Sequence, residues 1–230
     1  FDKDFVYPWK NKIDFKWNDQ WQTKAVRSHP YATETIKRND LMTNQIKCVF
    51  TEVPNDLDRF ILASQIIQAE AKKYFIEFWR MNKFDRNGIL WWNLRDGWPV
   101  ISDAIVDYYY TKKLAYHYIK RVQTDVCVMI GDAKESGHPV VIVNDTRMPV
   151  EGNFSIKDAD TKKVLLSKAF SISANGKSLE DNLPETDDTK LWMIEWEVDG
   201  VQYMNHYFVF KPHVELDEYL KWLPKIKQNQ

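Results

Sequence analysis

The sequence is poor in the residues that build disulfide, metal and phosphate-binding sites. Its two cysteines, Cys48 and Cys127, lie far apart and have no Cys-x-x-Cys partner, which favours buried free thiols over a disulfide. The 5 histidines show no His-x-x-x-His spacing of the kind that holds zinc. With only 7 glycines, the chain has no glycine-rich phosphate loop. We therefore expect no metal and no other cofactor.

Two further absences exclude broad classes of partner. The 32 basic and 33 acidic residues leave a net charge of −1, so the chain lacks the basic face that nucleic acid requires. No run of about 18 apolar residues occurs, which predicts no helix that crosses a membrane. The sequence begins at Phe1 with neither an initiator methionine nor a signal peptide, and we expect a mature form or a proteolytic piece of a longer product.

Aromatic residues, by contrast, are abundant, with 10 Trp, 11 Tyr and 12 Phe. Through residues 1–54 they alternate with Lys and Asp without a period of 2 or 3.6, which predicts irregular loop with short helical pieces. A long helix is then predicted, with Asn55 or Asp56 as its N-cap and apolar residues recurring at spacings of three and four up to Phe78. Lys73 is expected toward solvent, and Gly88 is a natural break after the helix.

Residues 89–92 form a short, continuous apolar run directly after this helix. Such a run is typical of a strand buried on both faces. A loop follows, and a second helix is predicted from Tyr108 or Tyr109 to Val122. The succession of helix, buried strand, long loop and helix indicates an α/β unit.

The pattern changes class after about residue 124. Short apolar runs, each bounded by turn residues, predict strands at 126–130, 140–143, 154–156, 164–170, 192–198 and 201–210. Between the last two runs, Asp199 and Gly200 are a strong hairpin signal. Six or seven short strands over about 100 residues are typical of an immunoglobulin-like β-sandwich. We therefore predict an α/β part in residues 1–122 and an all-β domain in residues 123–230.

Three segments, in order along the chain, resemble glycoside hydrolase family 2, in its β-mannosidase and exo-glucosaminidase branch. Residues 60–80 (FILASQIIQAEAKKYFIEFWR) resemble the last-but-one helix of that family's catalytic barrel. Residues 88–99 (GILWWNLRDGWP), with 107–109 and 113–121 after them, are similar to its eighth strand, the following loop and the final helix. Residues 205–212 (NHYFVFKP) resemble the last strand of the family's C-terminal sandwich, and Val143-Asn-Asp145 matches its second strand.

The resemblance implies an architecture that agrees with the change of class. Residues 1–122 would be the C-terminal part of a TIM (β/α)8 barrel, the catalytic domain of the family. Residues 123–230 would be an immunoglobulin-like β-sandwich. Residues 1–54 match the family poorly and are assigned by position only.

The resemblance also implies a retaining exo-β-glycosidase most like a β-mannosidase. Such enzymes use a nucleophile and an acid/base, two carboxylates about 5 to 5.5 Å apart. In this family the acid/base follows an Asn on the fourth barrel strand, and the nucleophile lies on the seventh. The chain contains no Asn-Glu pair and no Ser-Glu-x-Gly motif. Both catalytic carboxylates are therefore expected upstream of Phe1, and the fragment alone is expected to be inactive.

Four residues after the expected eighth strand are the candidate substrate-binding residues. Trp92 matches a family Trp that would form a flat wall under the sugar, although an ordinary core aromatic fits the position equally well. Asn93 replaces the family's usual Gln and could hydrogen-bond a hydroxyl. Arg95 stands where the family usually has Asn, which could favour an acidic or otherwise altered sugar. Asp96 either shapes the site or stabilises the turn beside Gly97.

Two classes of function stay open. The first is the C-terminal fragment of an exo-β-glycosidase, whose partners are a carbohydrate substrate and the remaining N-terminal part of the same protein. The second is a non-catalytic carbohydrate-binding or adhesion module, in which residues 88–121 would have no place. A barrel tail separated from its other strands exposes apolar surface, so a homo-oligomer is a further expectation. A periplasmic or secreted location is favoured over a cytoplasmic one.

Overall fold

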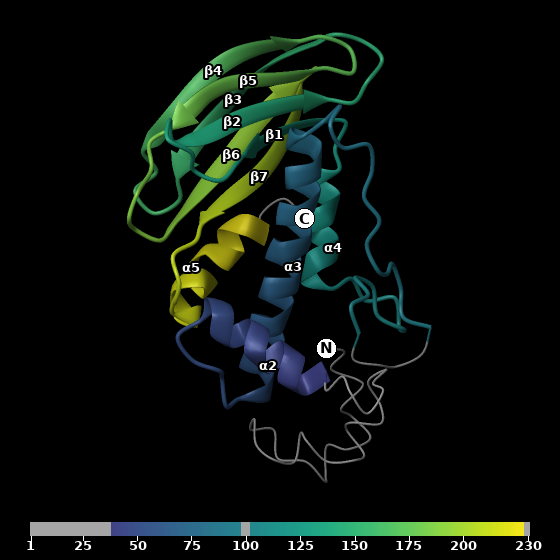
Figure 1. Ribbon diagram of the computed structural model, residues 1–230, viewed down its shortest axis with the longest axis vertical. Helices are drawn as coiled ribbons and strands as arrows, with labels where there is room; N and C mark the ends of the chain where they lie inside the picture. The colour runs from purple at the N-terminus through teal and green to yellow at the C-terminus, as the bar shows by residue number, and fades with distance from the viewer. Residues whose placement is uncertain (1–37, 98–101, 228–230) are drawn as a thin grey trace. The chain divides into compact units, whose positions relative to one another are not determined.

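The computed structural model describes residues 38–97 and 102–227, which fall into two compact units (Figure 1). Unit 1 comprises Phe1–Lys72, Leu90–Tyr118 and Pro212–Leu216. Unit 2 comprises Lys73–Ile89, Ile119–Lys211 and Asp217–Gln230. Each unit is thus assembled from segments that are far apart in the sequence.

Helices and strands are segregated along the described chain. The helices are α2 (Arg38–Val49), α3 (Leu57–Met81), α4 (Leu114–Val122) and α5 (Leu216–Lys227). The strands are β1 (Val126–Ile130), β2 (His138–Asn144), β3 (Val150–Asp158), β4 (Val164–Ile172), β5 (Lys177–Leu183), β6 (Lys190–Val198) and β7 (Val201–Val209). Helix α2 lies where irregular structure with helical pieces was predicted.

Unit 1 is built on α2 and the first part of α3. Asp56 is the N-cap of α3, as predicted, because its Oδ1 accepts a hydrogen bond from the Arg59 backbone N at 3.0 Å. Phe60, Ala63 and Ile66 in this part of the helix are fully buried. The end of α2 is tied to residues 212–216 by a parallel bridge in which the Thr51 N donates to the Val214 O at 3.0 Å.

Two predictions for this region are wrong. Residues 89–92 form no strand, and Leu90 is 98% exposed. The reason is that a buried strand needs partner strands on both sides, and no described strand pairs with this segment. The last helix does not begin at Tyr108 or Tyr109. The Asp107 Oδ1 accepts a hydrogen bond from the Thr111 N at 2.7 Å and Tyr110 has a φ of 68°, so this stretch is a turn outside helical geometry.

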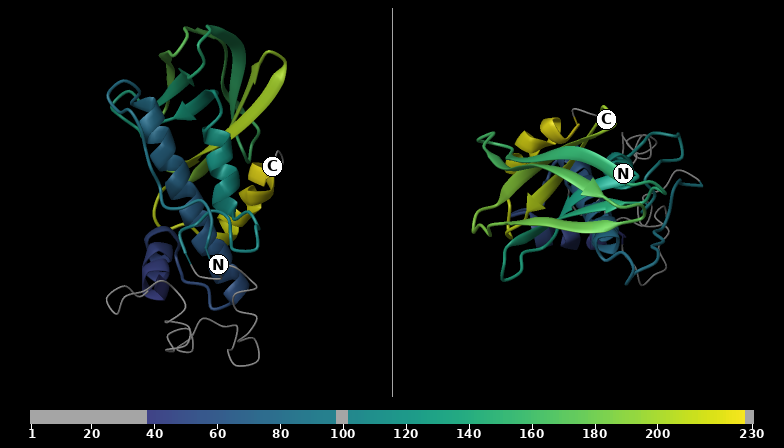
Figure 2. Two further views of the ribbon diagram at one scale, coloured as in Figure 1. Left: turned by 90° about the vertical axis from the view of Figure 1, so that its right-hand side faces the viewer. Right: turned by 90° about the horizontal axis from the view of Figure 1, so that it is seen from above.

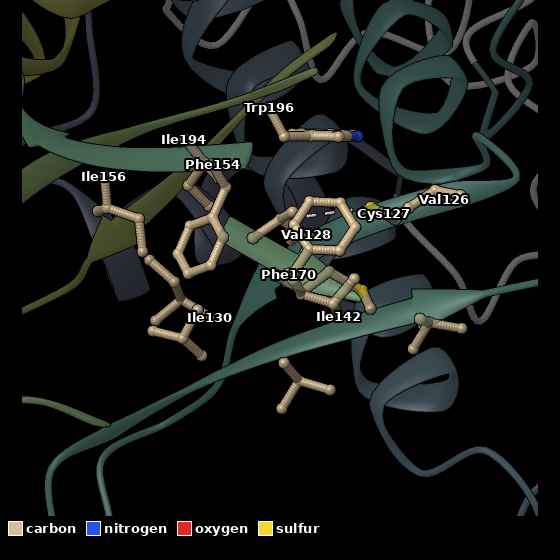
Figure 3. Packing of buried hydrophobic residues seen from close by; sticks show 14 of the residues in the cluster. Val126, Cys127, Val128, Ile130, Ile142, Phe154, Ile156, Phe170, Ile194 and Trp196 are labelled. Carbon is tan, nitrogen blue, oxygen red and sulfur yellow. Dashed lines mark hydrogen bonds between the residues drawn. The ribbon is translucent and has the colours of Figure 1, made fainter. Parts of the chain in front are cut away.

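Unit 2 contains two antiparallel sheets whose inner faces form one core, so the predicted all-β region is a sandwich. The strand order is β1-β2-β5 in one sheet and β4-β3-β6-β7 in the other. Figure 2 shows the two sheets from further directions. The core is a continuous cluster of buried residues from both sheets, and Figure 3 labels among them Val128, Ile130, Ile142, Phe154, Ile156, Phe170, Ile194 and Trp196.

The hairpin between β6 and β7 is confirmed. Val198 pairs with Val201, so the loop has only two residues, Asp199 and Gly200, with φ of 51° and 75°. Positive φ at both positions is the geometry of a type I′ turn, which matches the twist of the flanking strands. The short turn fixes the register of this hairpin along its whole length.

Strand β5 and helix α5 were not predicted. The β5 sequence KSLEDNL is polar, and most of its side chains are exposed or half-buried, so it lacks an apolar run. Helix α5 contains Pro224, a residue that normally argues against a helix interior. It is held to the sandwich by Trp222, whose Nε1 donates to the Asp160 Oδ1 at 2.8 Å.

The second part of α3 places charged groups inside unit 2. Lys73, predicted toward solvent, is buried beside Glu77, with 2.7 Å between the Lys73 Nζ and the Glu77 Oε2. The other oxygen of Glu77 accepts a hydrogen bond from the Asn205 Nδ2 at 2.6 Å. Pairing and hydrogen bonding together make this burial tolerable.

Both cysteines are free, as predicted. Burial raises the pKa of the Cys127 thiol to about 11. Cys48 is exposed, so the expectation of a buried thiol holds for Cys127 only.

Candidate functional site

The candidate substrate-binding residues lie in unit 1 on an extended segment that runs beside residues 105–106. The Val106 N donates to the Leu94 O at 2.9 Å, and the Asp96 N donates to the Val106 O at 3.1 Å. Arg95 and Val106 form an isolated parallel bridge. These backbone bonds give a loop a defined shape, so the four residues have fixed positions on it.

Asp96 turns into the protein. Its carboxylate is buried, with its Oδ2 3.1 Å from the Lys113 Nζ, and its Oδ1 accepts a hydrogen bond from the Ser102 hydroxyl. The Ser102 Oγ accepts in turn from the Ala104 N at 3.0 Å. A carboxylate engaged in this way anchors the base of the loop, so of the two interpretations of Asp96 the structural one is supported by its contacts.

Arg95 turns outward and lies against aromatic rings. Its guanidinium carbon is 3.8 Å from the centre of the Tyr110 ring and 5.8 Å from that of Tyr108. The Arg95 Nη2 also donates to the Tyr108 O at 3.3 Å. Stacking on aromatic faces orients a guanidinium while leaving its edge N–H groups available to an anion.

Trp92 is the most exposed aromatic of the loop, at 78%. Its carbonyl accepts a hydrogen bond from the Lys72 Nζ at 3.1 Å, and the same ammonium lies 5.0 Å from the centre of the Trp91 ring. Burial lowers the pKa of Lys72, the repulsion of Lys113 adds to this, and the attraction of Asp103 opposes it. The Lys72 hydrogen bond therefore holds the backbone at Trp92, and no side chain among residues 38–97 and 102–227 buries the ring.

Asn93 is half-buried and points along the loop. Its Nδ2 donates to the Arg95 O at 3.4 Å, while its Oδ1 accepts no hydrogen bond within the described part of the chain. This oxygen is the unused acceptor beside Trp92. The oxygen is buried in this structure, and a sugar hydroxyl that reached it would donate its O–H.

The buried carboxylates of the described residues all have structural partners: Asp96 and Asp107 in unit 1, Glu77 and Asp158 in unit 2. Within the described ranges no group of three His, Cys, Asp or Glu could hold a metal ion. Over the same ranges no helix is long and apolar enough to cross a membrane.

Sequence reasoning missed several residues of this site. Lys72 bonds to the backbone of Trp92, Lys113 pairs with Asp96, and Tyr110 stacks on Arg95. Each of these partners lies 15 or more residues from the loop residue that it contacts. The run of three tyrosines at 108–110 was the one available signal, because exposed aromatics in succession are unusual for a helix.

The chain is similar to known enzymes over part of their length. No protein-family model matches it. It is 31% identical over 117 residues to Beta-mannosidase B of Aspergillus niger, which is 44% of this chain and 14% of that protein. Beta-mannosidase B of Emericella nidulans is 40% identical over 70 residues, 29% of this chain and 8% of that protein.

Solved structures give a longer match. The β-D-mannosidase of Dictyoglomus thermophilum superposes with a TM-score of 0.72 at 25% identity, covering 91% of this chain and 26% of that one. An exo-chitosanase of Amycolatopsis orientalis has a TM-score of 0.66 at 18% identity, covering 84% and 24%, which is a likeness of fold. The chain thus spans about a quarter or less of the length of these proteins.

Proposed function

We propose that this chain, which is related to the C-terminal portion of glycoside hydrolase family 2 enzymes, is a C-terminal fragment of a retaining exo-β-glycosidase most like a β-mannosidase. The observation that carries the proposal is the agreement of two comparisons. Beta-mannosidase B proteins match it in sequence, and the Dictyoglomus thermophilum β-D-mannosidase matches its fold over 91% of its length.

In this proposal residues 1–122 complete a TIM barrel that begins upstream, and unit 2 carries an immunoglobulin-like sandwich. The strand order β1-β2-β5 against β4-β3-β6-β7 supports the second assignment, since the first, second and fifth strands of such domains share a sheet. The residues 88–97 would then lie at the carboxyl end of the barrel, where active sites of this fold form.

The substrate is proposed to be the non-reducing end of a β-linked saccharide. The exposed ring of Trp92 would lie under the sugar, and the Asn93 Oδ1 would accept a hydroxyl. Arg95, held on Tyr110, would face a neighbouring substituent. Both catalytic carboxylates would come from the upstream part of the protein, which is supported by the structural partners of all the buried carboxylates among the described residues. We also propose a periplasmic or secreted location, which cell fractionation with an antibody against this chain would test.

The experiment compares the 230-residue chain with the longer product of its gene, using an aryl β-mannoside. We expect turnover by the longer protein and none by the chain alone. In the longer protein, Trp92→Ala should raise KM and lower kcat/KM by about 10-fold, which corresponds to the loss of about 1.4 kcal/mol of stacking. Arg147→Ala, an exposed residue of unit 2, is the control. An upstream sequence without a barrel, or turnover by the chain alone, would contradict the proposal, and sugar binding without turnover by the longer protein would favour a binding module.

A further inference from the structure

A cavity in unit 2 is lined by none of the four candidate residues Trp92, Asn93, Arg95 and Asp96. It has a volume of about 320 Å³ and is open to solvent. Its walls come from the end of α3, the turn that follows α3, the end of β2 and the turn before β5, and among its lining residues are Arg80, Lys83, Phe84, Arg86, Asp145 and Asn175. The volume is near the lower end of the range for small-molecule sites.

The cavity has a surplus of positive charge. Arg80 and Lys83 share one carboxylate, that of Asp145, at 2.7 and 2.5 Å. Arg86 forms no ion pair among the described residues, and its guanidinium lies 4.7 Å from the centre of the Trp79 ring. Three cations therefore line a space that contains one anion. Two positive charges are left over, which favours an anionic ligand.

The basic groups are fixed in place before any ligand arrives. The Arg80 Nη1 donates to the Val122 O at 2.5 Å, and the Lys83 Nζ donates to the Asn144 O at 2.9 Å. Within the described part of the chain, the buried Nε of Arg80 has no acceptor. A preorganised set of donors binds an anion without the cost of ordering flexible side chains.

The remaining walls suit a sugar more than a simple ion. Phe84 is held at a φ of 78° and its ring is largely exposed at the cavity, which offers a flat apolar face. Asn87 and Asn175 line the same space and supply amide donors and acceptors. An aromatic face, side-chain amides and cations together match an apolar ring face, hydroxyls and a carboxylate.

We propose that this cavity binds a sugar acid, with its carboxylate on Arg86 and its ring against Phe84. The site is formed by unit 2 alone. It therefore does not depend on the proposed glycosidase activity, and it stands whether or not the longer protein cleaves mannosides.

Isothermal titration of the 230-residue chain with glucuronate tests the proposal, with glucose, acetate and inorganic phosphate as comparisons. We expect 1:1 binding of glucuronate, weaker binding of acetate and phosphate, and no heat from glucose. Arg86→Gln should weaken glucuronate binding about 10-fold or more, because a charge-assisted hydrogen bond is lost. Phe84→Ala should weaken the binding of glucuronate but leave the binding of acetate unchanged. Arg147→Gln, the same change at an exposed arginine that does not line the cavity, should have no effect.

Several outcomes would overturn the proposal. If glucose bound as tightly as glucuronate, the carboxylate would not be recognised. If phosphate bound as tightly as glucuronate, the sugar ring would not be recognised. Equal affinity of the parent chain and of Arg86→Gln for glucuronate would mean that glucuronate binds outside this cavity. Because Arg86 and Phe84 are both exposed, neither substitution should change the melting temperature of unit 2 appreciably, so a lost signal can be assigned to the site.

Discussion

A buried carboxylate stays charged only where a partner replaces the water that it has lost. Asp96 and Lys113 are such a pair in unit 1, with both side chains buried and 3.1 Å between the Asp96 Oδ2 and the Lys113 Nζ. Removing one partner leaves the other charge without compensation, which costs far more than the pair itself contributes.

We therefore expect Asp96→Ala to destabilise unit 1 by about 3–5 kcal/mol. The double substitution Asp96→Ala with Lys113→Met should recover most of this loss, because no unpaired charge is left. Urea unfolding followed by tryptophan fluorescence would measure both. A double variant as unstable as the single one would contradict this account of the pair.

Asp158 makes stability depend on pH at the β3–β4 turn. Its Oδ1 accepts hydrogen bonds from the backbone N of Thr161 at 2.8 Å and of Asp160 at 3.0 Å. Burial raises the pKa of Asp158, but these bonds and the charge of Lys190 outweigh it, and the pKa lies below 3.8. The folded chain thus holds the charged carboxylate at a pH where the unfolded chain would protonate it.

This sets the direction of the pH effect. The charged Asp158 carboxylate contributes its full stabilisation to the fold above a pH of about 3.8, and this stabilisation is lost as the pH falls through the folded-state pKa of Asp158. Asp158→Ala should lower the stability of unit 2 by about 1–2 kcal/mol at pH 7 through its lost hydrogen bonds, and the gap should narrow below pH 4. Chemical unfolding at pH 7 and pH 3 measures this, with the exposed Asp187→Ala as the matched control. A gap that stays constant with pH would exclude the carboxylate as its source.

Some helices and strands of this fold can be predicted from their own residues, whereas others form only through contacts with distant parts of the chain. β1 and β2 are buried apolar runs, and β6 and β7 are rich in apolar residues and joined by the Asp199-Gly200 turn, so their prediction was confirmed because each carries its own signal. β5 is polar and becomes a strand through its ladder with β2, in which Val143 pairs with Lys177. Residues 89–92 are the reverse case, an apolar run without a partner to make it a strand.

Helix α5 is stabilised by a tertiary contact that its own sequence does not reveal. Trp222 is buried, lies 6.1 Å from the Phe208 ring of β7, and donates its indole N–H to Asp160. The Lys225 Nζ adds a hydrogen bond to the Ala159 O at 2.6 Å. Pro224 is tolerated because packing outweighs its cost to the helix.

Trp222→Ala should therefore destabilise unit 2 by about 3–5 kcal/mol, the range for removing a buried tryptophan. Trp222→Phe keeps the ring contact and loses the hydrogen bond, so a smaller loss is expected. Lys221→Ala, at the exposed neighbouring position, should change stability by less than about 0.5 kcal/mol. Thermal unfolding of the three variants would give this order, and equal losses in all of them would mean that α5 is not docked through Trp222.

At the scale of the whole molecule, the sequence predicted the change from helices to a β-sandwich. It did not predict how Trp92 and Arg95 are held, because Lys72, Tyr108 and Tyr110 reach them through space. The exposed side chains of the loop alternate along it: Leu90 at 98%, Trp92 at 78% and Leu94 at 62%. Alternate exposure of large apolar groups along one extended segment is the surface that an unpaired strand presents.

A charged residue introduced on that face should affect the stability of the 230-residue chain and of the longer proposed protein differently. In the 230-residue chain Leu90→Glu should change stability by less than about 0.5 kcal/mol, since the side chain is already in water. In a protein that supplies the neighbouring barrel strands, Leu90 would be buried, and the same substitution would bury an unpaired carboxylate and cost several kcal/mol. Parallel unfolding of both lengths, with Lys112→Glu as an exposed control, measures the difference. Equal tolerance in the two proteins would mean that residues 89–92 are no barrel strand at any chain length.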